Sequence, residues 1–222
     1  MDRYWMFLEF MNAGCLTDII EKGLWKEFNE FAIQYVAFEI LKGLRYLHKK
    51  HIIHRDMKSD NIFLDKDGNL KIGDFGYAAQ LTQERRKRKS KMGTMCWMAP
   101  EIIKGTDPYC EKVDIWSYGI VLLELIQGQP PYFGEDTQKI CLYILTNQPP
   151  RIDKQKYSKE LCNFVECCLT KEQEQRSSVD DLLKHPFIQN MKYEECKKAY
   201  MNVLYEHTKV NEEQFDGALE FR

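Results

Sequence analysis

The fold is decided by His54-Arg55-Asp56-Met57-Lys58-Ser59-Asp60-Asn61 and by the triplet Asp74-Phe75-Gly76 that follows it. Short apolar pieces typical of strands flank the first stretch, at residues 52–54 (IIH), 62–64 (IFL) and 70–72 (LKI). The dipeptide Asp67-Gly68 between the last two is typical of a hairpin turn. We therefore expect a few short strands around the two polar motifs.

Helical patterns occupy most of the remaining chain. From about Glu27 to Lys50 apolar residues recur at helical spacing, and residues 114–127 are almost wholly apolar, which predicts a helix buried on all sides. Further helices are predicted near 136–146, 158–169 and 178–184. These patterns indicate an α+β fold that is mostly helical with a few short strands.

Three other segments give weaker signals. The aromatic-rich residues 4–11 (YWMFLEFM) predict a strand that enters a turn at Asn12–Gly14. Residues 82–91 (TQERRKRKSK) are highly charged and predict a loop. The tail, residues 188–222, is weakly amphipathic and predicts a peripheral helix, so we expect one main domain over residues 1–187.

Composition excludes several classes of protein. The 222 residues are 44% hydrophobic and 30% charged, which is ordinary for a globular domain with one core. The net charge of −2 gives no general attraction to nucleic acid or to an anionic membrane. No apolar run approaches the roughly 18–20 residues of a membrane span, and the N-terminus does not resemble a signal peptide. Eight cysteines without C-x-x-C spacing predict free thiols in a reducing cytosol or nucleus, and of the two we expect a cytoplasmic protein.

The two polar motifs suit the transfer of a phosphoryl group. Such a transfer needs one group that orients the attacking hydroxyl, and metal ions that hold the phosphates. The carboxylate of Asp56 suits the first task. The oxygens of Asn61 and Asp74 suit Mg²⁺, which prefers oxygen ligands. Lys58 is placed to neutralise charge on the transferred group.

Together with Ala99-Pro100-Glu101 and Asp114-Ile115-Trp116, these motifs resemble the catalytic domain of eukaryotic serine/threonine protein kinases. The segments HRDMKSDN, DFGYAAQLT, GTMCWMAPE, KVDIWSYGI and GQPPY are similar to the PAK branch of the sterile-20 group, and the likeness extends from Tyr4 to Phe187. The resemblance implies a protein-kinase-like fold, ATP and Mg²⁺ as cofactors, and a protein substrate with a serine or threonine acceptor.

The resemblance also implies roles for supporting residues. His54 and Phe75 would stack in the core that joins the two lobes of a kinase. Asp114 would hydrogen-bond the backbone of the catalytic loop, and Glu101 would form a buried ion pair with Arg176. These roles are architectural rather than catalytic.

Nucleotide contacts are expected in the first residues of the chain. By their position relative to the catalytic loop, Glu9 to Met11 resemble the hinge whose backbone meets the adenine ring, with Leu8 at the gate of the pocket; an ordinary hydrophobic strand is the alternative. Phe63 would form the pocket floor, where a more slender aliphatic side chain is usual.

Regulation and substrate choice are predicted on the same basis. Ser90 falls where PAK-like kinases carry an activating phosphate, which could pair with Arg55, although Ser90 could also be an incidental serine in a basic loop. Thr94 would touch Asp56 and shape the substrate pocket. Asp60 and Glu124 match positions that, in kinases with a preference for basic substrates, bind a substrate arginine upstream of the phosphoacceptor. The alternative is that each is a plain surface charge.

The front of the family pattern does not occur among the 222 residues. The glycine-rich phosphate loop and its partner lysine belong upstream of Tyr4, and no G-x-G-x-x-G is present. We expect these 222 residues alone to bind ATP weakly. Three interpretations stay open. The sequence could be part of an active kinase, a non-catalytic module that binds substrates or partners, or a small-molecule phosphotransferase. An upstream activating kinase or a small GTPase would act through regions outside this sequence.

Overall fold

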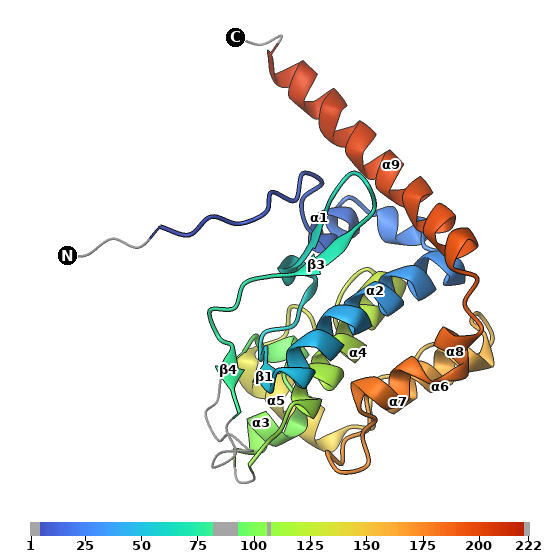
Figure 1. Ribbon diagram of the computed structural model, residues 1–222. Coiled ribbons are helices and arrows are strands. Elements are labelled where there is room, and N and C mark those ends of the chain that lie inside the picture. The colour runs from blue at the N-terminus through green and yellow to red at the C-terminus, as the bar shows by residue number, and fades with distance from the viewer. Residues whose placement is uncertain (1–4, 82–92, 106–107, 220–222) are drawn as a thin grey trace.

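The structure is a computed structural model that describes residues 5–81, 93–105 and 108–219. Its centre is helix α4 (Lys112–Gln127), in which every residue from Val113 to Ile126 is buried. The helix ends at Gly128, whose φ of 82° places it in the left-handed region that glycine adopts without strain. The predicted apolar helix therefore forms and is enclosed by the rest of the fold (Figure 1).

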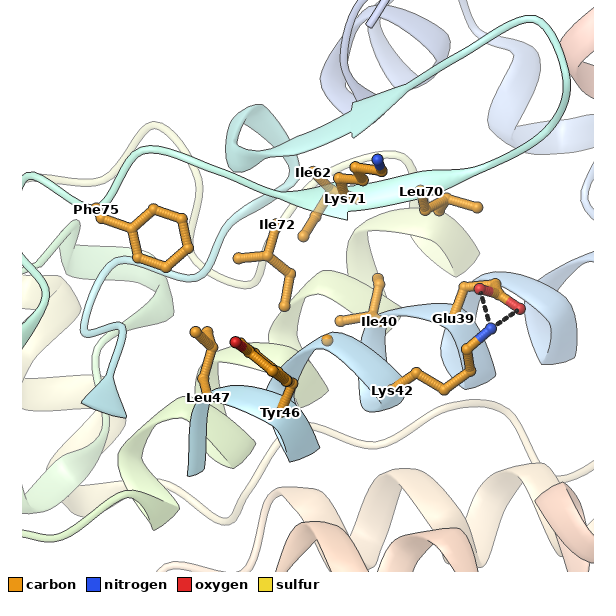
Figure 2. A pocket seen from close by; sticks show the side chains of 11 residues that line it. Glu39, Ile40, Lys42, Tyr46, Leu47, Ile62, Leu70, Lys71, Ile72 and Phe75 are labelled. Carbon is orange, nitrogen blue, oxygen red and sulfur yellow. Dashed lines mark hydrogen bonds and ion pairs between the residues drawn. The ribbon is translucent and has the colours of Figure 1, made fainter. Parts of the chain in front are cut away.

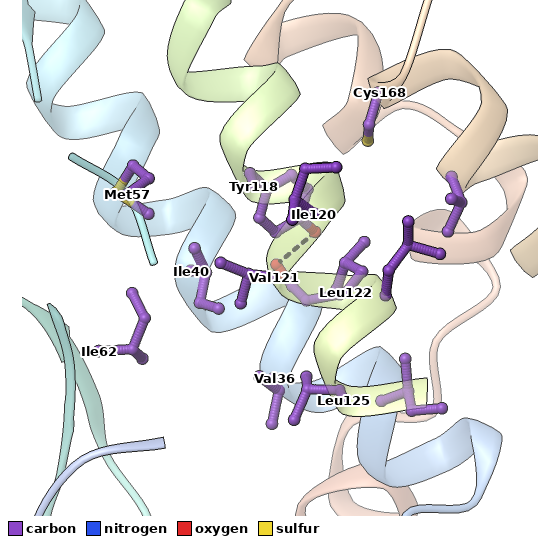
Figure 3. Close-up of a cluster of buried hydrophobic side chains, with 14 of the residues drawn as sticks. Val36, Ile40, Met57, Ile62, Tyr118, Ile120, Val121, Leu122, Leu125 and Cys168 are labelled. Carbon is purple, nitrogen blue, oxygen red and sulfur yellow. Dashed lines mark hydrogen bonds between the residues drawn. The ribbon is translucent and has the colours of Figure 1, made fainter. Parts of the chain in front are cut away.

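Helix α2 (Glu30–Lys49) packs alongside α4. Asn29 caps the N-terminus of α2, because the Asn29 side chain accepts a hydrogen bond from the backbone N–H of Ala32 at 3.0 Å. The Tyr118 hydroxyl of α4 donates to the carbonyl of Ala37 in α2 at 3.0 Å. Figure 3 shows aliphatic side chains of the two helices facing one another around this bond, which makes the α2–α4 contact part of the core.

Within the described part of the chain, four short strands form two antiparallel pairs beside these helices. Strand β2 (Ile62–Leu64) pairs with β3 (Leu70–Ile72), with Phe63 opposite Lys71. Strand β1 (Ile52–Ile53) pairs with β4 (Ala79–Gln80). The β2–β3 hairpin and its turn match the prediction, and the pairs place both polar motifs at strand ends.

The other elements complete a helical body. The predicted helices form as α5 (Thr137–Thr146), α6 (Lys159–Cys168) and α7 (Val179–Leu183). The described elements that were not predicted are α1 (Leu16–Glu21), η1 (Leu24–Glu27), η2 (Ser59–Asn61), β4 (Ala79–Gln80), η3 (Met95–Trp97), α3 (Pro100–Lys104) and α8 (Pro186–Gln189). Each of these has six residues or fewer, too short for a periodic pattern to stand out.

The predicted strand at the N-terminus is wrong for its described part, residues 5–11. This segment has no regular structure, and Phe7 and Leu8 are exposed at 94% and 79%. A strand needs a neighbouring strand to satisfy its backbone, and no described residue pairs with it. The predicted turn does form at Asn12–Gly14, where Ala13 N–H donates to the carbonyl of Leu64 at 3.0 Å.

The tail forms the long helix α9 (Tyr193–Leu219). Its first half packs on α2 and buries Cys196, Tyr200 and Leu204, while its far end extends beyond the rest of the fold (Figure 1). No helix among the described residues combines the length and the apolar content that crossing a membrane requires.

Candidate active site

The backbone of the catalytic loop is held by one buried carboxylate. Asp114, fully buried in the first turn of α4, accepts hydrogen bonds from the backbone N–H groups of His54 at 2.9 Å and Arg55 at 2.8 Å. The ring of His48 in α2 lies 2.9 Å from the same carboxylate. Arg55 has a φ of 69°, a conformation that non-glycine residues rarely adopt, so these bonds offset a local strain beside Asp56.

Asp56 is fixed by groups on three sides. Its Oδ1 accepts hydrogen bonds from the Thr94 hydroxyl at 2.8 Å and the Thr94 backbone N–H at 3.1 Å. Its Oδ2 lies 3.3 Å from Asn61 Nδ2 and 3.8 Å from Lys58 Nζ. The residue is only 5% exposed. The predicted base, its cation and the predicted pocket residue Thr94 are therefore in one cluster.

The two predicted metal ligands lie at the open end of the β2–β3 hairpin. The Asn61 amide nitrogen donates to the Asp56 carbonyl at 2.8 Å, which leaves its oxygen as the ligand atom. The backbone N–H of Gly73 donates to the Asn61 carbonyl at 2.9 Å. Because Asp74 is the next residue after Gly73, this hydrogen bond keeps the backbones of the two predicted ligands close together. Asp74 is exposed and has a φ of 54°.

This donor set fits Mg²⁺ in kind, because amide and carboxylate oxygens are hard ligands. No group of three or more His, Cys, Asp and Glu side chains gathers as a metal cage among the described residues. A phosphate-bound Mg²⁺ takes only one or two protein carboxylates, with phosphate and water oxygens as its other ligands. Asn61 and Asp74 would be the residues that hold such an ion.

The rings of His54 and Phe75 meet edge to face rather than stacked. Their centroids are 5.2 Å apart with the planes at 65°, and His54 Nε2 lies 2.9 Å from the Gly73 carbonyl. Phe75 is 48% exposed and borders an open pocket of about 420 Å³ between α2 and the hairpin. Figure 2 shows Phe75, Ile72 and Leu47 facing this pocket, which none of the predicted nucleotide residues lines.

The predicted nucleotide residues are not gathered in a closed pocket. Leu8 is exposed, and Glu9 forms an ion pair with Lys71 of β3. Met11 is half-buried. Phe63 lies against Gly73, where an added Cβ would come within 2.6 Å of the Phe63 ring. Their contact with adenine stays a prediction.

Glu124 joins the catalytic loop to the segment after Thr94. Its Oε1 accepts from the Ser59 hydroxyl at 2.8 Å and its Oε2 from Trp97 Nε1 at 2.6 Å. The Ser59 hydroxyl also lies 2.6 Å from that of Thr17. Burial raises the pKa of Glu124 to about 7, opposed by these two hydrogen bonds and assisted by the charge of Asp60.

The sign of this shift predicts a pH-dependent stability. Because the folded pKa is raised above the ordinary value of about 4.3, the folded state binds the extra proton first, and stability increases as pH falls through 7. Between pH 8 and pH 6 we expect a gain of about 1 kcal/mol in the free energy of unfolding. Urea unfolding at pH 8 and at pH 6 measures this gain, and Glu124→Gln should remove it. An equal gain in the variant would show that Glu124 is not the group that binds the proton.

Of the two residues predicted to hold a substrate arginine, only Asp60 is open to solvent. Glu124 is 3% exposed and both its oxygens already accept hydrogen bonds. The joint role of Asp60 and Glu124 stays a prediction. In this structure Glu124 acts first as a support for Ser59 and Trp97.

Glu101 and Arg176 form a buried, bidentate ion pair. Arg176 Nη1 lies 2.7 Å from Glu101 Oε1, and Nη2 lies 3.0 Å from Oε2. The guanidinium also donates to the carbonyls of Thr170, Lys112 and Lys171, and it covers the Trp116 ring at 5.2 Å. This pair ties α3 to the segment between α6 and α7, and the bond from Arg176 to the Lys112 carbonyl adds the start of α4.

The predicted phosphosite Ser90 lies outside the described residues. Arg55, its predicted partner, donates through Nε to the Tyr77 carbonyl at 2.6 Å and through Nη1 to the Tyr109 hydroxyl at 3.3 Å. The side chain is therefore directed toward the segment that follows Gly76.

The sequence model of the family described as "Protein kinase domain" matches residues 1–188. The chain belongs to the protein kinase family. It is 49% identical over 190 residues to the serine/threonine-protein kinase CLA4 of Candida albicans, covering 85% of this chain and 19% of that protein. It is 48% identical over 189 residues to the serine/threonine-protein kinase pakA of Dictyostelium discoideum, covering 84% of this chain and 16% of that protein.

The serine/threonine-protein kinase PAK 5 of Rattus norvegicus is 45% identical over 188 residues, which cover 84% of this chain and 26% of the relative. The chain thus spans about a quarter or less of the length of these three relatives. The predicted PAK-like kinase domain with a mostly helical fold is confirmed by the family match and these likenesses.

Several residues of the site were missed by sequence reasoning. His48, Ser59, Trp97 and Tyr109 bond to predicted site residues, but they are ordinary members of helices or loops in the sequence. The contacts of His48 with Asp114 and of Ser59 with Glu124 span more than sixty residues, and no local pattern signals them.

Proposed function

We propose that this chain provides the catalytic base and the metal ligands of a serine/threonine protein kinase that transfers the γ-phosphate of ATP to a protein hydroxyl. The observation that carries the proposal is the environment of Asp56. Its Oδ1 is occupied by two donors of Thr94, while Oδ2 is close to Lys58. A carboxylate held in this way can orient an attacking hydroxyl and accept its proton.

ATP and Mg²⁺ are the cofactors that this site suits. When bound, Mg²⁺ neutralises phosphate charge, and Asn61 and Asp74 are the protein ligands present for it. Lys58, whose Nζ lies near Asp56, would neutralise negative charge on the transferred phosphoryl group. Residues 8–11 and Phe63 would contact the nucleotide base.

The acceptor class is tested with three peptides that differ only in serine, threonine or tyrosine at the acceptor position. The pair Lys58 and Thr94 around Asp56 supports a preference for the aliphatic hydroxyls. We expect the full-length protein to phosphorylate the serine and threonine peptides and to leave the tyrosine peptide unmodified. Equal transfer to tyrosine would overturn the proposed class.

The substrate would be a protein of the cytoplasm, with basic residues upstream of the acceptor. Asp60 supports this preference because its carboxylate is exposed next to the catalytic loop. The names of the relatives support a PAK-like kinase, and an upstream kinase or a small GTPase would act through segments outside these 222 residues.

Phosphorylation of Ser90 is proposed to activate the kinase. A phosphate adds nearly two negative charges, and Arg55 lies one residue before Asp56, so their pairing would order the loop around the base. We expect Ser90→Ala in the full-length protein to lower kcat at least about tenfold, as one such charge-assisted contact is worth more than about 1.4 kcal/mol. Peptide phosphorylation measured after treatment with an activating kinase, on the variant and the wild type in parallel, checks this. An unchanged kcat for Ser90→Ala would remove the switch.

A further inference from the structure

Helix α9 lies beyond residues 1–188 and has no part in the proposed chemistry, yet it is built into the core. Tyr200 of α9 is fully buried and stacks on Tyr35 of α2, with ring centroids 5.1 Å apart and planes at 22°. Cys196 and Leu204 are buried on the same side of the helix. This first half of α9 is therefore fixed to the fold rather than loosely attached.

One contact of α9 reaches the turn of the β2–β3 hairpin. Gly68 has a φ of 87°, and a Cβ added there would lie 2.4 Å from the Met201 sulfur. The Tyr35 hydroxyl, beneath Tyr200, donates to the Gly68 carbonyl at 3.1 Å. The closed end of the hairpin is thus packed against α9, whereas its open end carries Asn61 and Asp74.

A second contact reaches the segment that follows the predicted hinge. His207 is fully buried, and its Nε2 lies 3.0 Å from the carbonyl of Ala13. Its Nδ1 lies 3.4 Å from Lys22 Nζ. A carbonyl only accepts and an ammonium only donates, so the ring must be neutral with its hydrogen on Nε2. Burial and the charge of Lys22 lower the pKa of His207, and the hydrogen bond to Ala13 and the charge of Asp18 oppose them in part, which agrees with a neutral ring.

The two contacts meet through one backbone ladder. Ala13 N–H donates to the Leu64 carbonyl at 3.0 Å, and Leu64 N–H donates to the Gly14 carbonyl at 2.9 Å. Leu64 is the last residue of β2, whose other end begins directly after Asn61. Movement of Ala13 would therefore be transmitted to the strand that positions the metal ligand.

We propose that α9 is a brace that sets the nucleotide-binding segment against the β2–β3 hairpin, with His207 as the positioning residue. The inference rests on the proposed function for its kinetic consequence, but its structural consequence can be tested separately. His207 touches neither substrate nor metal in this account; it acts through Ala13. Loss of its hydrogen bond should weaken the binding of ATP and leave the base at Asp56 in place.

The experiment compares three substitutions of His207 in the full-length protein. His207→Phe fills the volume but cannot donate, and His207→Asn is polar and smaller but its amide is too short to reach Ala13. His207→Gln can place an amide N–H near the position of Nε2 and serves as the rescue. Tyr205→Ala, at a residue of α9 that is 65% exposed, is the matched control.

Two readouts are measured for each variant, together with the free energy of unfolding. Hydrogen exchange of peptides containing Ala13 and Leu64 should accelerate between about threefold and tenfold in the Phe and Asn variants, the range expected for one lost hydrogen bond. The KM for ATP should increase by a similar factor, with kcat and the KM for peptide unchanged. The Gln variant and the Tyr205→Ala control should resemble the wild type.

Unchanged exchange at Ala13 and Leu64 in both the Phe and the Asn variants would overturn the brace. Equal increases in the KM for ATP in all four variants would also overturn it. If the wild-type protein transfers no phosphate, the proposed function fails, while the exchange measurement still decides whether α9 holds the segment. If the Phe variant does not fold, the Asn variant carries the same comparison.

Discussion

Asp56→Asn in the full-length protein is expected to lower kcat about 10²- to 10⁴-fold, the range found when a general base is removed. Asparagine keeps the size of the side chain and can still accept the hydrogen bond from the Thr94 hydroxyl, so the loop should keep its shape. It carries no charge to face Lys58 and cannot accept the proton of the attacking hydroxyl. The KM for ATP should change little, because Asp56 is not among the predicted nucleotide contacts.

Steady-state rates with a serine peptide measure this effect. Asp67→Asn is the matched control, since Asp67 is an exposed carboxylate in the β2–β3 turn and has no proposed part in catalysis. Its kcat should equal that of the wild type. A kcat within about threefold of wild type for Asp56→Asn would contradict the role of Asp56.

The buried pair of Glu101 and Arg176 should give the largest effect on stability. Arg176 is 1% exposed and makes hydrogen bonds to both Glu101 oxygens and to three carbonyls. Glu101→Ala leaves this guanidinium without its counter-ion in the core. Breaking such a pair from one side costs about 3–5 kcal/mol, a large part of the roughly 5–15 kcal/mol by which domains are stable.

Urea unfolding of the two single variants and the double variant tests this. Glu101→Ala and Arg176→Met should each lose about 3–5 kcal/mol, and the double variant should lose less than their sum. The exposed pair of Arg45 and Asp180, 2.7 Å apart, is the control, and Asp180→Asn should cost no more than about 1 kcal/mol. Losses as small as those of the control would show that the buried pair does not support the fold.

The sequence predicted those parts of the fold that have a local pattern. The apolar run of α4, the helical spacing of α2 and the Asp67-Gly68 turn each determine their own structure. The strand expected at residues 4–11 was wrong over residues 5–11 because pairing depends on a partner strand, and none of the described residues supplies one. Helix α9 was expected at the periphery, but Tyr200 and His207 are buried, and weak amphipathicity gives no measure of such contacts.

The residue types of the site and some of its supports, such as Asp114 beneath the catalytic loop, were predicted from the sequence, but other supports were not. Asp56, Asn61 and Asp74 are named by the chemistry of their short motifs, and the structure places Asp56 and Asn61 in hydrogen-bond contact. The burial of Glu124 beneath Ser59 and Trp97 was not predicted. Carboxylate side chains are usually exposed, and the sequence does not show the hydrogen-bond partners that allow this one to be buried. His207 was missed for the same reason, since its partner Ala13 lies near the other end of the chain.

Transfer of labelled γ-phosphate from ATP to a serine peptide, measured with the full-length protein and its Asp74→Asn variant purified side by side, tests whether this chain carries the catalytic site. We expect Mg²⁺-dependent labelling of the serine by the wild type and at least about a hundredfold less by the variant, because Asp74→Asn removes the negative charge that would bind the metal. No labelling by the wild type after activation, or equal labelling by both proteins, would contradict the assignment of this chain as the catalytic part of a serine/threonine kinase.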